Sequence, residues 1–141
     1  MSNILVPVDG SESAKRAVKA AIEAVKLING AKLHLLTVRP PILSGNVTRF
    51  ISAEALNDYY QDEGRKALES AKELLDNAGL AYEEKIEIGQ AAVCIADYVK
   101  EHQINQIIMG TRGLGSVTGL VLGSVATKVL SLVDVPVTLV R

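Results

Sequence analysis

The sequence predicts an α/β protein in which one open, five-stranded parallel sheet carries helices on both faces. Short runs of Val, Ile and Leu alternate along the chain with longer stretches whose apolar residues recur every three or four positions. The composition is 48% hydrophobic but only 4% aromatic, which fits aliphatic strands covered by Ala- and Leu-rich helices. With 141 residues the chain has the size of one domain, so we assign residues 1–141 to a single domain.

The first predicted unit is a strand followed by a helix. An apolar run over residues 4–8 ends at the turn-forming pair Asp9-Gly10, which indicates a strand buried on both faces. From Ser11 the apolar spacing becomes helical, with basic and acidic residues on the opposite face. Asn29-Gly30 ends this helix.

The second unit contains the longest predicted helix. An apolar strand over residues 33–38 stops before Pro40, and an irregular connection extends to residue 52. A helix is predicted from Ala53 to Ala78, and Gly64 is expected to weaken or bend it.

The remaining elements complete the sheet. Residues 82–88 alternate polar and apolar, which indicates an edge strand with one wet face. A helix over residues 92–102, a strand over 106–109, a helix over 124–132 and a strand over 136–140 follow. Alternation of this kind predicts parallel strands joined by right-handed crossovers, and we expect the strand order 3-2-1-4-5.

Charge and cysteine content exclude several classes of function. With 15 Lys and Arg against 16 Asp and Glu, no overall positive field attracts nucleic acid or an anionic membrane. Cys94 is the single cysteine and is expected to be a buried structural thiol. We expect a cytoplasmic protein, because no signal peptide is evident and no apolar run approaches the roughly 18 residues of a membrane span. The two histidines, His34 and His102, support neither a metal cluster nor a Ser-His-Asp arrangement.

The glycine-rich stretch MGTRGLGSVTGLVLGSV, residues 109–125, carries the functional signal. It joins the fourth strand to the last helix, and ligands of open α/β sheets bind outside the carboxyl ends of the strands, where the strand order reverses. Asp9 and Gly110 end the first and fourth strands, so both are expected to face one crevice. Glycine there is explained by unusual backbone angles or by close backbone approach, and a phosphate chain requires the second.

The start of the last helix suits an anion. Its first N–H groups lack partners within the helix and carry the positive end of the dipole, and Gly123 removes the side chain that would exclude a phosphate. Ser124 is expected either to cap the helix or to turn its hydroxyl to the ligand. An ordinary glycine-rich loop with a normal cap is the alternative.

Two better-known glycine motifs do not fit. A Walker A loop requires Lys after its last glycine, but Ser124 follows Gly123. The dinucleotide fingerprint should follow the first strand, whereas that strand leads into Asp-Gly-Ser-Glu-Ser.

The chain as a whole resembles the universal stress protein family, in its nucleotide-binding branch. The resemblance covers the N-terminal Val-Pro-Val-Asp-Gly-Ser, the order of strands and helices, and the pattern Gly-x2-Gly-x9-Gly-Ser/Thr, present as Gly110, Gly113, Gly123 and Ser124. It implies the layers of adenine nucleotide alpha hydrolase-like and flavodoxin-like folds. Ala126 and Ala91 depart from residues that many relatives have.

The resemblance implies an adenine nucleotide between the first and fourth strands, ATP foremost and AMP or ADP as alternatives. Pro7, Val8 and Asp9 would line the adenosine side, and Val38 would meet the adenine edge through its backbone. Met109 and Gly110 would flank the ribose and α-phosphate. The phosphates would lie against main-chain amides of Gly113, Gly123, Ser124 and Val125, and Mg²⁺ would enter only with them.

For two side chains the sequence leaves two roles open. Asp9 fits the nucleotide site or is the turn-forming acid that Asp-Gly-Ser favours. Arg112 contacts the phosphates or points into solvent.

The leading functional hypothesis is a stress-response protein that acts by nucleotide-dependent conformation or partner binding, and at most as a slow ATPase, since no base or arginine finger is evident. The alternatives are a nucleotide-independent interaction module of the same fold, and an AMP or cyclic AMP sensor. The apolar segment Val135 to Val140 predicts a pairing sheet edge, and the resemblance implies a homodimer through it, with an unknown regulatory partner besides.

Overall fold

The strands and helices alternate along the chain as the sequence predicts. The computed structural model describes residues 2–42, 51–112 and 122–141. Within them the elements are, in order, β1 Asn3–Pro7, α1 Glu12–Leu27, β2 Lys32–Arg39, α3 Ala53–Asn77, β3 Tyr82–Ile88, α4 Ala91–Glu101, β4 Gln106–Gly110, α5 Ser124–Leu132 and β5 Val137–Val140. The five strands form one parallel sheet in the order β3-β2-β1-β4-β5. The predicted fold class and strand order are therefore confirmed.

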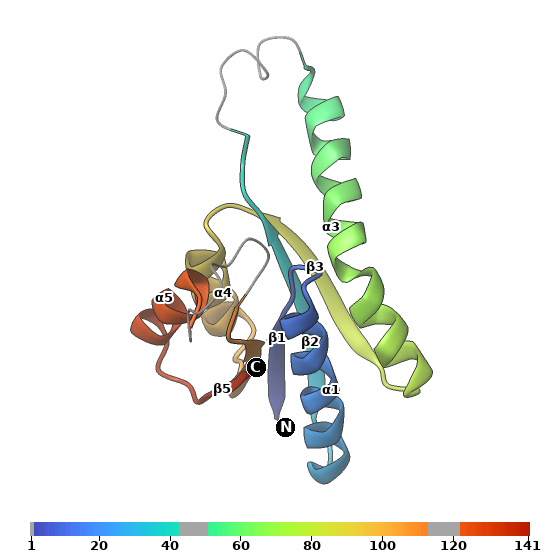
Figure 1. Cartoon of the computed structure of the whole chain (residues 1–141), viewed down its shortest axis with the longest axis vertical. Coiled ribbons are helices and arrows are strands. Elements are labelled where there is room, and N and C mark those ends of the chain that lie inside the picture. Colours follow the sequence, from blue (N-terminus) through green and yellow to red (C-terminus); the bar gives the residue numbers. More distant parts are fainter. Residues whose placement is uncertain (1, 43–50, 113–121) are drawn as a thin grey trace.

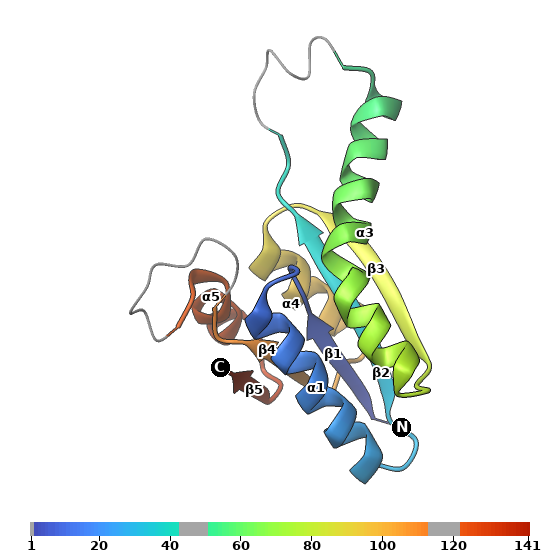
Figure 2. The same ribbon diagram turned by 45° about the vertical axis from the view of Figure 1, so that its right-hand side comes forward.

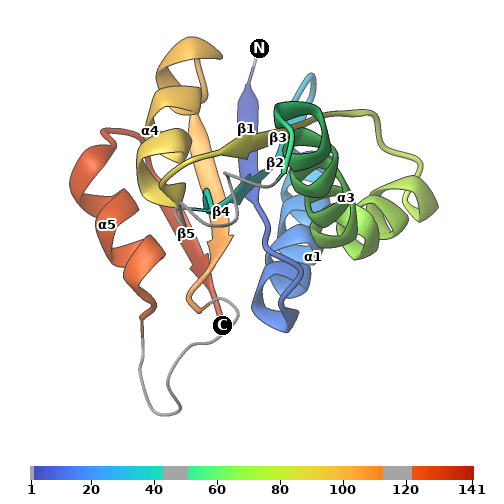
Figure 3. The same cartoon turned by 90° about the horizontal axis from the view of Figure 1, so that it is seen from above.

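Helices cover both faces of the sheet, so the core has two halves (Figure 3). α1 and α3 pack on one face, where Ile4, Val6 and Leu35 are buried with apolar residues of both helices. α4 and α5 pack on the other face, against Leu5, Leu36 and Ile107. The alternation of side chains along each strand sends successive residues to opposite halves. The central strands are apolar throughout because both of their faces are covered.

Side-chain caps fix where the first two helices begin. Ser11 Oγ accepts a hydrogen bond from the Ala14 N–H at 3.1 Å, and Ser52 Oγ accepts one from the Ala55 N–H at 3.0 Å. Each cap satisfies a donor that has no acceptor within its helix. Gly79, with φ of +71°, follows the C-terminus of α3.

Gly64 lies inside α3 without interrupting it. The helix runs unbroken from Ala53 to Asn77, and Gly64 is buried. A Cβ built at Gly64 would lie 2.5–2.9 Å from three carbons of Ile86 on β3. Glycine at this position lets the helix approach the sheet closely.

The N-terminal part of α3 extends beyond the sheet (Figure 1), while α1 lies over β1 and β4 and the rest of α3 lies over β2 and β3 (Figure 2). Tyr60, on this part, is buried, and its hydroxyl accepts a hydrogen bond from the Ile42 N–H at 2.7 Å. In the described part of the chain, no helix combines the length and apolarity that crossing a membrane requires.

Candidate functional site

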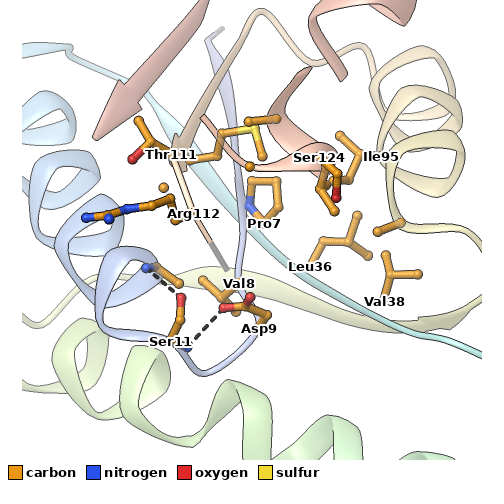
Figure 4. A pocket seen from close by; sticks show the side chains of 17 residues that line it. Pro7, Val8, Asp9, Ser11, Leu36, Val38, Ile95, Thr111, Arg112 and Ser124 are labelled. Carbon is orange, nitrogen blue, oxygen red and sulfur yellow. Dashed lines mark hydrogen bonds between the residues drawn. The ribbon is translucent and has the colours of Figure 1, made fainter. Parts of the chain in front are cut away.

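A cleft lies at the carboxyl ends of the strands, at the point where β1 and β4 separate (Figure 4). The space between its walls, counted out to the open solvent, is about 730 Å³. The first turns of three helices and the ends of three strands supply its walls. The lining residues are Pro7, Val8, Asp9, Ser11, Ala14, Leu36, Val38, Ala91, Ile95, Met109, Gly110, Thr111, Arg112, Gly123, Ser124, Val125 and Ala126.

The structure brings most of the sequence-predicted site residues to this one cleft. Pro7 and Met109 are separated by about a hundred positions in sequence, yet both line it, because β1 and β4 are paired neighbours. Ten of the eleven predicted residues line the cleft: Pro7, Val8, Asp9, Val38, Met109, Gly110, Arg112, Gly123, Ser124 and Val125. The eleventh, Gly113, lies outside the described residues.

Asp9 shapes the turn between β1 and α1 while lining the cleft. Its Oδ1 accepts a hydrogen bond from the Ser11 N–H at 2.9 Å, the contact of an Asx turn. Gly10 follows with φ of +87°, a conformation that favours glycine. The turn-forming interpretation of Asp9 therefore holds, and it is compatible with a second role in the cleft.

The start of α5 presents main-chain donors to the cleft. Gly123, not Ser124, is the N-cap residue, so of the two alternatives for Ser124 the capping one is wrong. The first main-chain bond of the helix joins the Thr127 N–H to the Gly123 carbonyl at 3.1 Å. The N–H groups of Ser124, Val125 and Ala126 thus have no acceptor within the helix, and Gly123 has no side chain to cap them.

Close approach, and not backbone angle, explains glycine at position 123. Its φ of −75° and ψ of 164° are accessible to any residue. Gly123 is buried, and its N–H donates to the Thr111 carbonyl, so the start of α5 is held against the end of β4. A side chain at position 123 would stand beside the first N–H groups of α5.

The main chain of Val38 faces the cleft as well. The Leu36 carbonyl accepts from the Val8 N–H at 2.8 Å on the β1 side, and the Arg39 carbonyl accepts from the Gly89 N–H at 3.0 Å on the β3 side. Main-chain groups of a strand alternate between its two neighbours, so the N–H and carbonyl of Val38 point to the β1 side. At Val38 this side is the cleft, because β1 ends at Pro7. A donor and an acceptor therefore lie side by side on the wall.

Arg112 is exposed, and its guanidinium extends toward α1, away from Leu36 and Val38 (Figure 4). Arg112 also lines the cleft, so both alternatives for this residue stay predictions.

Seven lining residues were not among the predicted site residues: Ser11, Ala14, Leu36, Ala91, Ile95, Thr111 and Ala126. Leu36 had a detectable signal, because it precedes Val38 by two residues in a strand and so shares its face. Ile95 had none, since helical periodicity predicts a core position without saying which part of the core. Thr111 is buried, and its Oγ1 has no partner among the described residues.

Two chemically distinct groups line the cleft. Leu36, Val38 and Ile95 contribute an apolar wall, and the start of α5 contributes the main-chain donors of Ser124 to Ala126. Among the described residues no group of three or more His, Cys, Asp or Glu side chains could hold a metal ion. Such a cleft suits a flat, largely apolar group joined to an anion.

Cys94 lies in α4, close to this end of the sheet. It is half-buried, not fully buried as expected. Burial, together with the negative charge of Glu87, raises the pKa of its thiol, which keeps it protonated at neutral pH.

Comparison with known proteins identifies the family. The universal stress protein family model matches residues 1–141. The chain belongs to the universal stress protein family. The universal stress protein YxiE of Bacillus subtilis is 30% identical over 147 residues, covering 99% of each chain. Among solved structures, hypothetical protein MJ0577 is 27% identical with a TM-score of 0.84, covering 99% of this chain and 94% of its own. A universal stress protein solved in complex with cAMP is 25% identical with a TM-score of 0.73, covering 99% and 97% of the two chains.

Proposed function

We propose that this universal stress protein binds an adenine nucleotide in the cleft, ATP foremost, and acts in the cytoplasm as a nucleotide-dependent regulator or partner-binding switch in the stress response. The observation that carries the proposal is the start of α5, whose first N–H groups have no acceptor within the helix and no side-chain cap among the described residues. These donors line the same cleft as an apolar wall and the main chain of Val38.

Each part of a nucleotide has a counterpart in the cleft. The phosphates accept hydrogen bonds from the N–H groups of Ser124 and Val125 at the positive end of the α5 dipole. The base lies against the apolar wall, where the Val38 N–H and carbonyl match the acceptor and donor on the edge of adenine. Asp9 lines the same cleft, and its carboxylate is assigned to the ribose hydroxyls. Mg²⁺ enters with the phosphates.

The cleft is built for binding more than for rapid chemistry. Hydrolysis requires a positioned water and stabilisation of the charge that develops at the γ-phosphate. Asp9 is the one carboxylate among the described lining residues, and its Oδ1 is engaged in the turn. ATP turnover is therefore slow at most.

A second candidate is a sensor of AMP or cyclic AMP, which the cAMP complex of the 25% identical relative favours. Monophosphates require only the part of the cleft nearest the α5 start. A nucleotide-independent interaction module of the same fold is the third candidate, and it requires no nucleotide binding at all.

Titration calorimetry with ATP, ADP, AMP, cAMP and GTP separates these candidates. The proposal predicts the highest affinity for ATP and no measurable binding of GTP. Equal affinities for AMP and ATP would favour the monophosphate sensor. If all five nucleotides gave only heats of dilution, none of them would bind, and the nucleotide-independent interaction module would be the remaining candidate.

Gly123→Val tests the phosphate end of the cleft. The valine side chain stands beside the α5 donors while the backbone angles stay accessible, so we expect at least a tenfold loss of ATP affinity, about 1.4 kcal/mol, with the fold retained. Ser131→Val is the matched control, because it adds a valine at an exposed position in the last turn of the same helix. Unchanged affinity in a folded Gly123→Val variant would reject the assignment.

Asp9→Ala tests the ribose contact. Because Asp9 is assigned to the ribose, this change should lower the affinity for adenosine as much as the affinity for ATP.

We also assign the open edge of β5 to a homodimer. β5 is the last strand of the sheet, and its outer edge has no neighbour within the described chain. The residues of the segment Val135 to Val140 are exposed or half-buried, so they contribute apolar surface next to that edge. Unpaired strand edges of this kind pair readily with a second chain.

A further inference from the structure

Two histidines that are distant in sequence meet at the amino-terminal end of the sheet, opposite the cleft. His34 on β2 is buried, and its Nδ1 lies 2.7 Å from the hydroxyl of Tyr98 on α4. The His102 ring, just after α4, stacks on the Tyr98 ring with centroids 3.8 Å apart, and its centroid is 5.8 Å from that of His34. We call His34, Tyr98 and His102 the imidazole cluster.

The hydrogen bonds around His34 specify a neutral ring. The Asn3 side-chain amide donates to the carbonyl of Gln103 at 3.2 Å, so its Oδ1 is left as an acceptor, 3.4 Å from His34 Nε2. Nε2 therefore carries the hydrogen, and Nδ1 accepts from the Tyr98 hydroxyl. In this state both ring nitrogens and the buried hydroxyl are satisfied.

A second proton would disturb this arrangement. It would have to occupy Nδ1, which then no longer accepts from Tyr98, and the buried hydroxyl hydrogen loses its acceptor. It would also bring a positive charge into a site where the His34 side chain is only 4% exposed. Desolvation of that charge opposes protonation.

The surrounding charges offset only part of the cost of burying a positive charge on His34. Glu83 on β3 places a carboxylate oxygen 3.5 Å from His34 Nδ1, but that carboxylate is half-exposed and also binds Lys32 at 2.7 Å. Lys32, on the same strand as His34, and His102 both oppose a positive charge on the ring. Burial dominates and lowers the pKa of His34 below its ordinary value of 6.5, although Glu83 acts in the opposite direction.

The same cluster attaches the C-terminal end of α4 to the sheet. Tyr98 binds β2 through His34, and Asn3 on β1 binds the main chain just after the helix. We propose that the imidazole cluster is an acid-sensitive contact, which keeps the end of α4 on the sheet while His34 is neutral and loosens it when His34 takes up a proton.

The sign of the pH dependence follows from linkage. The folded protein favours neutral His34, whereas the unfolded chain takes up the proton near pH 6.5. The stabilisation is complete above that pH and is lost as the pH falls below it. The loss ends only when the pH passes the lower pKa of the folded state.

NMR titration of the full chain tests the proposal directly. With two histidines in the sequence, two imidazole Cε1–H signals are expected, and His102→Gln assigns them. The His34 signal should titrate with a midpoint below 6.5. Amides of residues 95–102 should shift and lose hydrogen-exchange protection, corrected for intrinsic rates, with that same midpoint. Amides of α1, which packs on the other face, should not.

His34→Gln is the matched variant, because its amide keeps a donor and an acceptor but does not titrate. We expect the α4 transition to disappear in His34→Gln and to persist in His102→Gln. A His34 midpoint at or above 6.5, or an α4 transition that persists in folded His34→Gln, would overturn the proposal. If His34→Gln does not fold, the titration of the wild type still tests the proposal. Amides of α4 whose transition does not share the His34 midpoint would then reject the proposal.

Discussion

Gly110 illustrates at the scale of one residue how packing and ligand binding share a position. The family resemblance places it beside the ribose and α-phosphate of a nucleotide, and it lines the cleft. A Cβ at Gly110 would also lie 2.9 Å from the main-chain carbon and the Cβ of Ser13 on α1. Ser13 in turn donates a hydrogen bond to the Val140 carbonyl at 3.2 Å, so α1, β4 and β5 meet here. The glycine is required by the fold whether or not a nucleotide is bound.

Gly110→Ala is therefore expected to lower the free energy of unfolding by about 1–3 kcal/mol, the usual cost of overpacking. Ser13→Ala should not rescue it, because the main-chain carbon and Cβ of Ser13 remain in place. Urea unfolding followed by far-UV circular dichroism measures the effect. Lys19→Ala, on the exposed face of α1, is the control and should stay within about 0.5 kcal/mol of wild type. A Gly110→Ala protein as stable as this control would contradict the packing argument.

At the scale of elements, α3 can lie close to the sheet because position 64 is a glycine without a side chain. Gly64 brings the helix against Ile86, and the close contacts would involve all three outer carbons of that residue. Ile86 is β-branched and stiff in a strand, so it cannot easily move aside. Glycine is otherwise unfavourable inside a helix by about 1 kcal/mol relative to alanine. The packing gain offsets this cost.

Gly64→Ala is expected to lower the free energy of unfolding in the wild type and to raise it in an Ile86→Ala background. In the wild type the added methyl group meets Ile86, and we expect a loss of about 1–3 kcal/mol in the free energy of unfolding. In an Ile86→Ala background the contact is absent, and helix propensity should make the same change stabilising by about 0.5–1 kcal/mol. A double-mutant cycle by urea unfolding measures both values. Equal effects in the two backgrounds would show that Ile86 does not determine the need for glycine.

The sequence predicted the elements better than their contacts. Residues 82–88 were predicted as an edge strand from their alternation, and β3 has these bounds and that place in the sheet. Ten predicted site residues reach one cleft because the strand order brings the ends of β1, β2 and β4 together and α5 begins beside the end of β4. Contacts between side chains that are far apart in the sequence could not be predicted from local patterns. Gly64 suggested a bend in the helix, and nothing in the spacing of His34 and His102 indicated that their rings lie close together.

At the scale of the whole molecule, the two ends of the sheet have different roles. The carboxyl end holds the cleft, with Ala91 and Ile95 contributed by α4. The opposite end holds the imidazole cluster, where α4 is attached through Tyr98. The same helix therefore contacts both sites, and β5 forms an open edge beside them.

The edge of β5 gives a test of the proposed homodimer. The Pro136 carbonyl accepts from the Ile107 N–H of β4, and the Val140 carbonyl accepts from the Thr111 N–H just after β4. The main-chain N–H groups of Val137 and Leu139 therefore point outward, to the open edge. Val137→Pro removes one outward donor while leaving the bonds to β4, and proline is tolerated on edge strands in this orientation. We expect sedimentation velocity at tens of micromolar to show a dimer for wild type and mainly monomer for Val137→Pro. Thr138→Val keeps every main-chain donor and should remain dimeric. A wild-type monomer, or a folded Val137→Pro dimer, would place any association of this chain elsewhere than on β5.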